Sequence, residues 1–517
     1  MRTIATATLD RHGSGLAHVI RLDGSVPLDR MLVGNKGYGL DAMRRHGLPV
    51  PPAFAITTAA CRAWQRDRHT VMEGVWPHIR EALTWLESET GRTFAHGPHP
   101  LLVSVRSGAA QSMPGMMDTI LDLGLDDDVR DSLAAECGES FATDTRQRFV
   151  EMYTKIVLDG AGEVPADPWE QLRGAIEAVF ESWNTDRARA YRAHHDLDDD
   201  AGTAVVVQAM VFGNLNDRSG SGVLFSRNPM TGALEPFGEW LACSQGEDVV
   251  AGTHSCDPID ALGEVLPDVH RQLLDSARTL EGLGTDVQDI EFTVEDGQLW
   301  ILQTRNAKRS AAAAVRFALA LRDEGAIDDR EVVRRVEPSH IATLLKPALQ
   351  PETRFAAPLL ATGLPACPGV ASGVVITDPD EVIEAADDQD VVLARATTSP
   401  DDIHGMLAAA AIVTELGGAT SHAAVVSREI GRPAVVGCGA GTITSFAGQV
   451  VTVDGNNGEI RAGALELTAW KISDSPELIE LEAIIDAVDP SAATASLLDK
   501  LTAARAALDS TTWGDDE

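Results

Sequence analysis

The sequence predicts a multidomain protein of mixed α/β and α+β class. Residues 1 to about 340 alternate strand-like and helix-like segments with many glycine-containing loops, a pattern typical of sheets covered by helices. Prolines crowd residues 341–370, which indicates a linker. Short apolar strands and then amphipathic helices follow it. With 517 residues, the chain is long enough for several ordinary cores.

These observations divide the chain into successive segments. We expect a large domain over residues 1–345, a linker over 346–367, a compact β/α domain over 368–465 and a helical tail over 466–517. The apolar runs that should form strands in the compact domain are Val374–Ile376, Val391–Leu393 and Val450–Val453. The tail should form helices over Leu478–Val488 and Ala493–Leu508, where apolar residues recur at helical spacing.

The composition excludes several classes of partner. The formal net charge of −36 argues against nucleic acid and anionic membrane surfaces. No apolar run approaches the roughly 20 residues that a bilayer requires, and charges near the N-terminus interrupt any signal core. The six cysteines form no CxxC pair, so reduced thiols in a soluble cytoplasmic protein are expected.

Two glycine-containing loops of the large domain carry basic residues. In Gly34-Asn35-Lys36-Gly37 a lysine lies between glycines, where it can reach a phosphate while the loop donates N–H groups; the spacing is not that of a Walker A loop. Further on, a strand delivers Arg106 to the small-residue loop Ser107–Thr119, which can fold over phosphates. The alternative there is an ordinary strand-to-helix connection with methionines in the core.

The segment after the strand at residues 204–207 could hold an adenine ring. Apolar side chains and backbone polar groups near Val211 would suit it. The glycine-rich segment that follows could supply Arg227, and Gln245–Gly252 offers Glu247. The alternative is a plain β-hairpin with turn glycines.

A second hairpin is predicted between residues 287 and 305. Its strands flank Glu295-Asp296-Gly297, and a three-residue loop with Gly297 left-handed is a common connection. One face would then carry Asp289, Glu291, Gln303 and Arg305. Two carboxylates and an amide oxygen beside a guanidinium suit Mg²⁺ with a phosphate close by. A solvated hairpin with salt bridges is the alternative.

A buried strand over residues 410–413 is expected to run through a glycine turn into a helix that begins at about His422. Thr420 and Ser421 supply hydroxyl groups that can cap the helix, and Gly431 ends it. His422 would lie in the first turn, where free N–H groups favour an anion. A neutral imidazole there is available as a nucleophile. The alternative is a histidine near a helix cap with no chemistry.

The string from Thr414 to Val426, TELGGATSHAAVV, resembles the phosphohistidine loop of the phosphoenolpyruvate-utilising enzymes, and the continuation to Gly439 also fits. The upstream segments resemble the ATP-grasp nucleotide domain of the pyruvate phosphate dikinase branch of this family, in the same order. The resemblance covers roughly residues 25–465. It implies an ATP-grasp domain followed by a swivelling phosphohistidine β/α domain and a short helical tail.

The resemblance implies roles for particular residues. ATP would be bound by Lys36, Arg106, Val211, Glu247, Asp289 and Arg305, and the cofactor Mg²⁺ by Glu291 and Gln303. His422 would be phosphorylated, and Thr420 matches a threonine that some relatives phosphorylate for regulation. The family usually has glycine where this chain has Asn35, and the helical stretch after Met152–Val157 is shorter here.

The implied reaction uses ATP and phosphate to form AMP, pyrophosphate and phosphohistidine, with onward transfer to pyruvate. A (β/α)₈ barrel of about 250 residues would hold pyruvate or phosphoenolpyruvate in the family, and the roughly 50 residues after the histidine domain are too few for one. We therefore expect the barrel on a separate subunit. The alternatives are a phosphotransferase with another acceptor and a non-catalytic protein that senses nucleotides.

Overall fold

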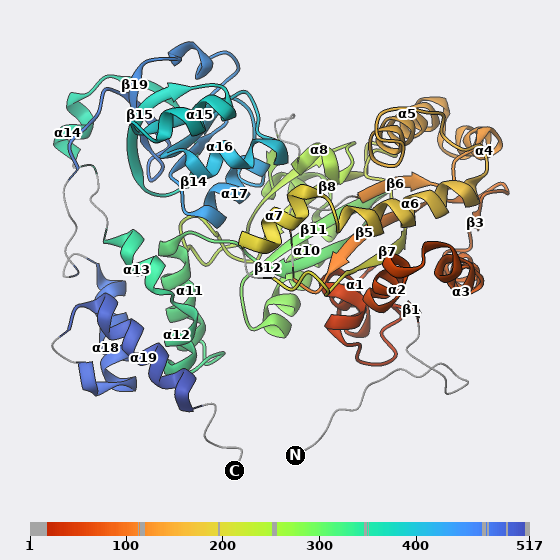
Figure 1. The fold of residues 1–517 in the computed structure, drawn as a ribbon, viewed down its shortest axis with the longest axis horizontal. Helices are drawn as coiled ribbons and strands as arrows, with labels where there is room; N and C mark the ends of the chain where they lie inside the picture. The colour runs from red at the N-terminus through yellow and green to blue at the C-terminus, as the bar shows by residue number, and fades with distance from the viewer. Residues whose placement is uncertain are drawn as a thin grey trace. The chain divides into compact units, whose positions relative to one another are not determined.

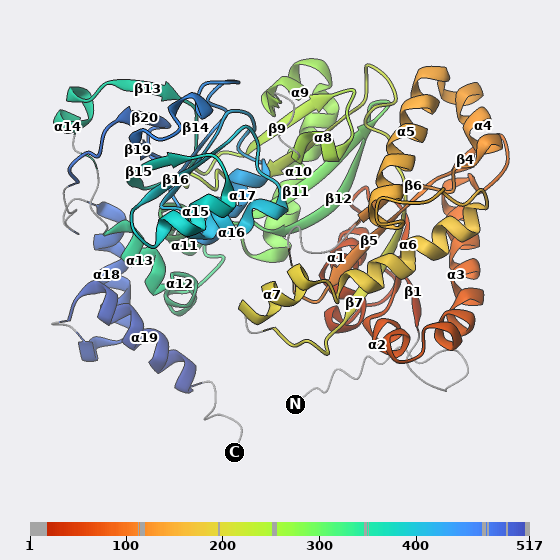
Figure 2. The same cartoon turned by 45° about the horizontal axis from the view of Figure 1, so that its top comes forward.

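The computed structural model describes residues 18–111, 113, 119–194, 197–250, 256–345, 349, 351–467, 472, 475–492 and 495–511. The chain divides into two compact units, the first made of Met1–Gly220 with Phe292–Thr304 and the second of Ser221–Glu291 with Arg305–Glu517. Figures 1 and 2 show the elements in chain order. The predicted multidomain class with mixed α/β structure is confirmed.

The described part of the first unit contains a five-stranded sheet with the order β1-β2-β7-β5-β6. All neighbouring strands in it pair antiparallel. Strand β7 is buried along its whole length, which fits its run of valines and alanines. The strands are β1 (Val19–Arg21), β2 (Ala53–Ile56), β5 (Val103–Ala109), β6 (Thr119–Leu123) and β7 (Thr203–Ala209), with a short separate pair β3 (Thr93–Phe94) and β4 (Pro100–Leu101).

Helices pack against this sheet and bury one large apolar cluster with it. Aspartates begin several of them, because Asp29, Asp67, Asp126 and Asp167 each accept a backbone N–H of the first turn. The helices of this unit are α1 (Arg30–Arg45), α2 (Thr58–Arg66), α3 (Arg68–Thr90), α4 (Asp127–Cys137), α5 (Glu139–Ile156), α6 (Pro168–Ser182) and α7 (Asp186–His194), and α2–α6 contribute to the cluster.

A second sheet, with the order β10-β9-β8-β11-β12, continues into the second unit. Its strands are β8 (Gly220–Phe225), β9 (Phe237–Ala242), β10 (Asp257–Pro258), β11 (Gln288–Glu295) and β12 (Gln298–Asn306). The helices of this segment are α8 (Gly246–Val250), α9 (Asp260–Val265) and α10 (Pro267–Gly284).

The predicted hairpin is β11–β12, but its turn is shorter than the three-residue loop expected. Glu295 still belongs to β11, so only Asp296 and Gly297 connect the strands. Both have positive φ, 46° and 77°, which is the geometry of a type I′ turn. The Asp-Gly pair favours this tighter connection, since both residue types tolerate the left-handed region.

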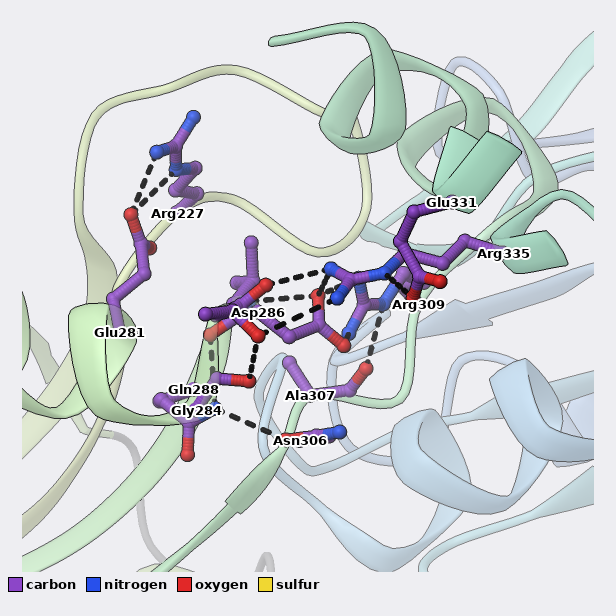
Figure 3. A network of polar contacts seen from close by, with 12 residues as sticks. Arg227, Glu281, Gly284, Asp286, Gln288, Asn306, Ala307, Arg309, Glu331 and Arg335 are labelled. Carbon is purple, nitrogen blue, oxygen red and sulfur yellow. Dashed lines mark hydrogen bonds and ion pairs between the residues drawn. The ribbon is translucent and has the colours of Figure 1, made fainter. Parts of the chain in front are cut away.

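Ion pairs fix the second sheet to the helices that follow it (Figure 3). Arg309, after β12, binds both carboxylate oxygens of Asp286 at 2.7 and 2.8 Å. Arg335 donates to the Thr285 carbonyl at 2.6 Å and to Glu331 at 2.8 Å. These contacts join α12 (Asp329–Arg335) and the segment after β12 to the segment between α10 and β11.

Residues 351–467 of the second unit contain a curved sheet and its helices, here called the curved-sheet domain. Its eight-stranded sheet has the order β13-β20-β19-β15-β16-β17-β18-β14, so β13 and β14, which are consecutive in the chain, lie at opposite edges. Gly363 between them donates to the Gly458 carbonyl at 2.9 Å, and a Cβ on it would lie 2.6 Å from the Val436 carbonyl oxygen. The sheet therefore closes on itself at this glycine.

The predicted strands of this domain are confirmed, and apolar clusters cover both sheet faces. The strands are β13 (Leu359–Thr362), β14 (Leu364–Cys367), β15 (Val370–Ile376), β16 (Val391–Arg395), β17 (Ala411–Thr414), β18 (Ala434–Val436), β19 (Val450–Asp454) and β20 (Glu459–Ala462). The helices are α14 (Pro351–Ala356), α15 (Pro379–Ala386), α16 (Ile403–Ala408) and α17 (His422–Ile430).

The two predicted tail helices are present and join three earlier helices in one apolar cluster, here called the helical bundle. Its members are α11 (Ala311–Asp323), α12 (Asp329–Arg335), α13 (Pro338–Leu344), α18 (Pro476–Val488) and α19 (Leu497–Thr511). Helix α19 begins at Leu497, later than the predicted start at Ala493, which itself lies outside the described residues. None of the helices described is long and apolar enough to cross a bilayer.

Candidate active site

His422 is the first residue of α17, as the sequence predicts, and its ring is half-buried. The loop from Glu415 to Ser421, here called the His422 loop, connects β17 to this helix. Gly417 has φ 106°, a conformation that needs glycine. Ser421 is the N-cap residue, yet its side chain makes no cap hydrogen bond, so this part of the prediction was wrong.

The ring of His422 is oriented through one nitrogen. Its Nδ1 lies 3.0 Å from Oγ1 of Thr398. The Thr398 loop is itself held by Asp402, which accepts from the backbone N–H of Ser399 at 2.7 Å. Burial lowers the pKa of His422, against a smaller opposing effect of Asp402. Burial therefore favours the neutral form of the imidazole. In the neutral tautomer whose Nδ1–H donates to the threonine oxygen, Nε2 carries the lone pair.

Glu239 of β9 binds the His422 loop with a buried carboxylate. One oxygen accepts from the backbone N–H of Ala419 at 2.8 Å, and the other accepts from the N–H of Thr420 at 3.2 Å and its hydroxyl at 2.5 Å. A Cβ on Gly418 would lie 2.1 Å from the same carboxylate. The glycine is thus required by this contact, and the loop docks on the second sheet through an anion at a helix N-terminus.

Two further charged side chains, Glu415 and Arg428, hold the His422 loop in place. Glu415 accepts from the backbone N–H groups of Gly441 and Thr444, at 2.8 and 2.9 Å. Burial opposes this charge, but the hydrogen bonds prevail and lower the pKa of Glu415. Arg428, buried on α17, donates to the Ala419 carbonyl at 3.0 Å. Burial lowers the pKa of Arg428 to about 10.

The second sheet carries a buried ion pair on adjacent strands. Arg305 of β12 donates to Asp289 of β11 at 2.8 Å. Burial raises the pKa of Asp289 although Arg305 opposes this. Burial also lowers the pKa of Arg305, but attraction to Asp289 and Glu291 outweighs it and raises the pKa overall. Beside this pair, Lys308 contacts Glu429 of α17 at 3.0 Å, so α17 lies along the same end of the sheet.

In the first unit, the two predicted phosphate loops lie against each other. Gly34, with φ 72° inside α1, meets Gly108 so closely that a Cβ on it would fall 1.7 Å from the Gly108 carbonyl oxygen. A Cβ on Gly108 would lie 3.6 Å from Cβ of Lys36. Lys36 and the end of β5, which carries Arg106, are therefore neighbours. Ser112 and residues 114–118 of the second loop lie outside the described residues.

The predicted adenine segment follows β7. Val211 is half-buried, and the backbone N–H of the adjacent Phe212 donates to Glu295 at 3.0 Å. Gly39, three residues after Lys36, faces the Thr304 carbonyl, which a Cβ would approach to 3.8 Å. The Lys36 loop therefore lies beside the strand end that carries Gln303.

Comparisons with known proteins agree with this arrangement. A model of the "pyruvate phosphate dikinase, AMP/ATP-binding domain" matches residues 65–270, and one of the "PEP-utilising enzyme, mobile domain" matches residues 387–458. The chain is 41% identical to pyruvate, phosphate dikinase 2 of Zea mays over 470 residues, covering 82% of this chain and 53% of that protein. It is 40% identical to pyruvate, phosphate dikinase of Clostridium symbiosum over 509 residues, covering 87% and 58%.

Over most of its length, the chain is similar to the phosphoenolpyruvate-utilising enzymes. Its relatives carry the name of one branch, the pyruvate phosphate dikinases. The chain spans somewhat more than half the length of the relatives that it matches.

The structure distributes the predicted family residues over both units. Lys36, Arg106, Val211 and Gln303 belong to the first unit. The second unit contains Glu247, Asp289, Glu291, Arg305, Thr420 and His422. Within the second unit, Asp289 and Arg305 are in contact, whereas Glu247 lies separately on the short helix α8.

The expectation that Arg227 could serve a nucleotide was wrong. Its guanidinium is buried between Glu281 and Glu324, with contacts of 2.6 and 2.7 Å (Figure 3 shows the pairing with Glu281). Both carboxylates raise its pKa against the effect of burial. These two carboxylates take four of the five N–H donors of the guanidinium and neutralise its charge, so Arg227 joins α10 to the end of α11.

Sequence reasoning missed the two side chains that position the His422 loop. Glu239 is far from it in the chain, and its strand carries no motif. Thr398 lies in a loop rich in small polar residues, which looks like any turn. The polar run Thr397–Asp402, which follows the buried strand β16, is the sequence feature that could have indicated a site at this strand end.

Proposed function

We propose that the protein transfers a phosphoryl group from ATP to Nε2 of His422, in a reaction that requires Mg²⁺. The observation that carries this proposal is the docking of the His422 loop on Glu239. Strand β9, which bears Glu239, belongs to the same sheet as Asp289 and Arg305. The nucleophile is thereby held on the sheet whose strand ends carry the proposed phosphate-binding charges.

The ring of His422 is suited to attack. In the tautomer whose Nδ1–H donates to Thr398, the lone pair of Nε2 is the nucleophile, and burial favours the unprotonated imidazole. Lys36, Arg106 and Arg305 would stabilise the charge that develops on the phosphoryl oxygens, which is the main catalytic contribution in such transfers.

The residues proposed for Mg²⁺ fit its chemistry. Glu291 and Gln303, on the adjacent strands β11 and β12, offer hard oxygen donors. The described residues contain no cluster of three acidic, histidine or cysteine side chains suited to a metal. Magnesium commonly takes one or two protein oxygens and completes its shell with phosphate and water. When bound, it would neutralise charge on the triphosphate.

Following the names of the relatives, we propose the dikinase form of the reaction. The bond from Nε2 to the β-phosphorus forms, and the bond between the β-phosphorus and the oxygen retained by AMP breaks. An oxygen of inorganic phosphate then bonds to the γ-phosphorus and gives pyrophosphate, while the bond between the γ-phosphorus and the β,γ-bridging oxygen breaks and leaves that oxygen on the β-phosphoryl group. Phosphohistidine then passes its group to pyruvate.

Thr420 remains a predicted site of regulatory phosphorylation. In the docked loop its hydroxyl is buried and donates to Glu239. We propose that it can be modified only when the loop has left β9. A phosphate there would face the carboxylate and oppose renewed docking.

ATP labelled at either the β or the γ position tests the proposal. With Mg²⁺ and phosphate we expect β-label on wild-type protein, AMP in equal amount, and no label after chelation of magnesium. His422→Asn should carry none, whereas His404→Asn, which alters an exposed histidine paired with Asp380, should behave as wild type. Nucleotide binding without AMP or label would instead identify a nucleotide sensor.

The expected separate subunit is tested with the labelled protein. Addition of pyruvate alone should leave the label in place if the acceptor site lies on another polypeptide. Release of labelled phosphoenolpyruvate by the isolated chain would contradict that arrangement.

A further inference from the structure

The parallel strands β15, β16 and β17 end at the edge of the sheet from which the His422 loop leaves. Loops that follow adjacent parallel strands lie next to one another at such an edge. Arg395, the last residue of β16, is opposite Thr414, the last residue of β17. A side chain at the end of β16 can therefore act on the loops that follow both strands.

The main chain at the end of β16 joins the His422 loop to the loop before it. The Arg395 carbonyl accepts from the Glu415 N–H at 3.0 Å, and the Ala396 carbonyl accepts from the Leu416 N–H at 2.9 Å. Residues 396–399 form the Thr398 loop, whose threonine contacts Nδ1 of His422. The two loops therefore leave the sheet in a fixed register.

The side chain of Arg395 makes two contacts with neighbouring segments. Nη1 donates to the carbonyl of Thr377, which follows β15, at 3.1 Å. Nη2 lies 3.3 Å from Oδ1 of Asp402, in an ion pair. Because the guanidinium is planar, contacts from two of its nitrogens fix its orientation. Arg395 thereby connects the end of β15 to the short helix Pro400–Asp402, which follows the Thr398 loop.

Asp402 is buried, and both of its carboxylate oxygens are bound. Oδ1 faces Arg395, and Oδ2 accepts from the backbone N–H of Ser399 at 2.7 Å and from its hydroxyl at 3.3 Å. Ser399 follows Thr398 directly, so this carboxylate holds the end of the Thr398 loop. A buried carboxylate is costly unless a cation and hydrogen bonds compensate for its charge. Arg395 is the cation that the structure pairs with it.

The charge of Asp402 also acts on the His422 ring. It raises the pKa of His422, although burial lowers that pKa by more. A negative charge near an imidazole favours the protonated form, and a protonated ring has no lone pair with which to attack a phosphorus atom. A guanidinium bound to the same carboxylate offsets this effect. The ion pair can therefore order the Thr398 loop without protonating the nucleophile.

Other titratable groups on α17, or on elements and loops that pack against it, are bound elsewhere. The thiol of Cys438 is uncharged at neutral pH, because burial raises its pKa to about 12, and Cys367 donates to the Pro368 carbonyl at 3.8 Å. The charged groups with contacts of their own are Glu239 and Arg428 on the backbone of the His422 loop, Glu415 on Gly441 and Thr444, His404 on Asp380, and Glu429 on Lys308. The charge that changes the pKa of His422 is that of Asp402.

We propose that Arg395 is a positioning residue for His422 and acts through Asp402. The ion pair holds the Thr398 loop beside Nδ1 of the ring and offsets the negative charge that favours its protonation. Arg395 thus differs from Arg106 and Arg305, which are proposed to meet the phosphate itself. The consequence for phosphorylation rests on the proposed function, whereas the effect on the ring does not.

A nuclear magnetic resonance titration of His422 tests the proposal without nucleotide. The protein is labelled at the Cε1 atoms of histidine, and the His422 signal is assigned by its absence in His422→Asn. Arg395→Gln should raise the pKa of His422 above that of wild type, because the charge of Asp402 is then uncompensated. Asp402→Asn should lower it, and the double variant should return it towards wild type. Loosening of the loop alone would not give shifts of opposite sign.

Two further variants control this titration. Arg395→Lys keeps the positive charge and should titrate like wild type. Arg432→Gln removes another arginine of the same domain, which donates to the Leu407 carbonyl at 3.1 Å, and should change nothing. An unchanged or lower pKa of His422 in Arg395→Gln would overturn the proposal. If Arg395→Gln does not fold, the double variant takes its place, since it leaves no unpaired buried charge. Its pKa should then lie above that of Asp402→Asn, and equality would overturn the proposal.

The consequence for the reaction is measured as single-turnover formation of phosphohistidine from Mg-ATP. Arg395→Gln should be roughly three- to tenfold slower than wild type at pH 8, as expected for loss of one ion pair that holds the Thr398 loop. The KM for ATP should stay near that of wild type, and Arg395→Lys should recover most of the rate. On acidification, the rate of Arg395→Gln should begin to fall at a higher pH than that of wild type. A wild-type rate and pH profile would overturn the role in phosphorylation. Absence of phosphohistidine in wild type would count against the proposed function alone, because the titration needs no nucleotide.

Discussion

Replacement of Glu239 by glutamine should slow phosphorylation of His422 strongly. The carboxylate accepts three hydrogen bonds, from Ala419 N–H, Thr420 N–H and the Thr420 hydroxyl. Glutamine preserves the shape and one acceptor oxygen. Its NH₂ group, however, would face the N–H or O–H donors of the loop and cannot accept from them. Loss of about two hydrogen bonds to a charged acceptor costs about 3 kcal/mol in the docked state. Since every 1.4 kcal/mol is about tenfold, docking should weaken by as much as about 100-fold.

The assay is a single-turnover measurement of phosphohistidine formation from Mg-ATP, with ATP binding measured in parallel. Glu239→Gln should reduce the rate and leave ATP affinity near that of wild type, because Glu239 contacts the loop. Glu264→Gln, on an exposed residue of α9, serves as the control for a neutralised carboxylate. A rate for Glu239→Gln equal to that of the control would refute the reasoning that docking through this carboxylate precedes transfer.

The remaining predictions concern the same loop. Gly418→Ala should be as slow as Glu239→Gln, because its Cβ would lie 2.1 Å from the Glu239 carboxylate; adding it to Glu239→Ala should cost little more, and additive losses would contradict the clash. Thr398→Val removes the contact to Nδ1 and should slow phosphorylation about fivefold, the effect of one hydrogen bond of about 1 kcal/mol; a wild-type rate would exclude the positioning role. Burial lowers the pKa of His422 while Asp402 raises it, so the rate of phosphohistidine formation should fall only below pH 6.5. Asp402→Asn should move that fall to lower pH. A fall above pH 6.5 would contradict a neutral, buried ring.

Local patterns in the sequence predicted the position of the nucleophile. The apolar strand, the glycine turn and the helix from His422 to Gly431 are specified by neighbouring residues, and the structure has them at those places. The sequence also placed Asp289 and Arg305 on the two strands of one hairpin, where their side chains are in contact. The turn itself was one residue shorter than predicted, since strand pairing extended through Glu295.

Contacts between residues far apart in the chain could not be predicted from local sequence patterns. Glu239 and the Ala419 N–H that it accepts from are 180 residues apart, and no periodicity links them. Long separation in the chain also explains why Arg227 was expected to bind a nucleotide, because its partners Glu281 and Glu324 lie far along the chain and could not be inferred from local patterns. A helix-cap role for Ser421 was a reasonable local inference, but its side chain makes no cap hydrogen bond, and the glutamate of another strand binds the N–H groups of the two residues before it.

The most direct test of the account is the site of phosphorylation. After brief incubation with Mg-ATP and phosphate, the protein should be digested at neutral to alkaline pH and its peptides analysed by mass spectrometry. The account predicts a single acid-labile phosphoryl group on the peptide containing His422, attached to Nε2. A phosphoryl group on another residue, or an unmodified His422 under conditions where AMP accumulates, would contradict it.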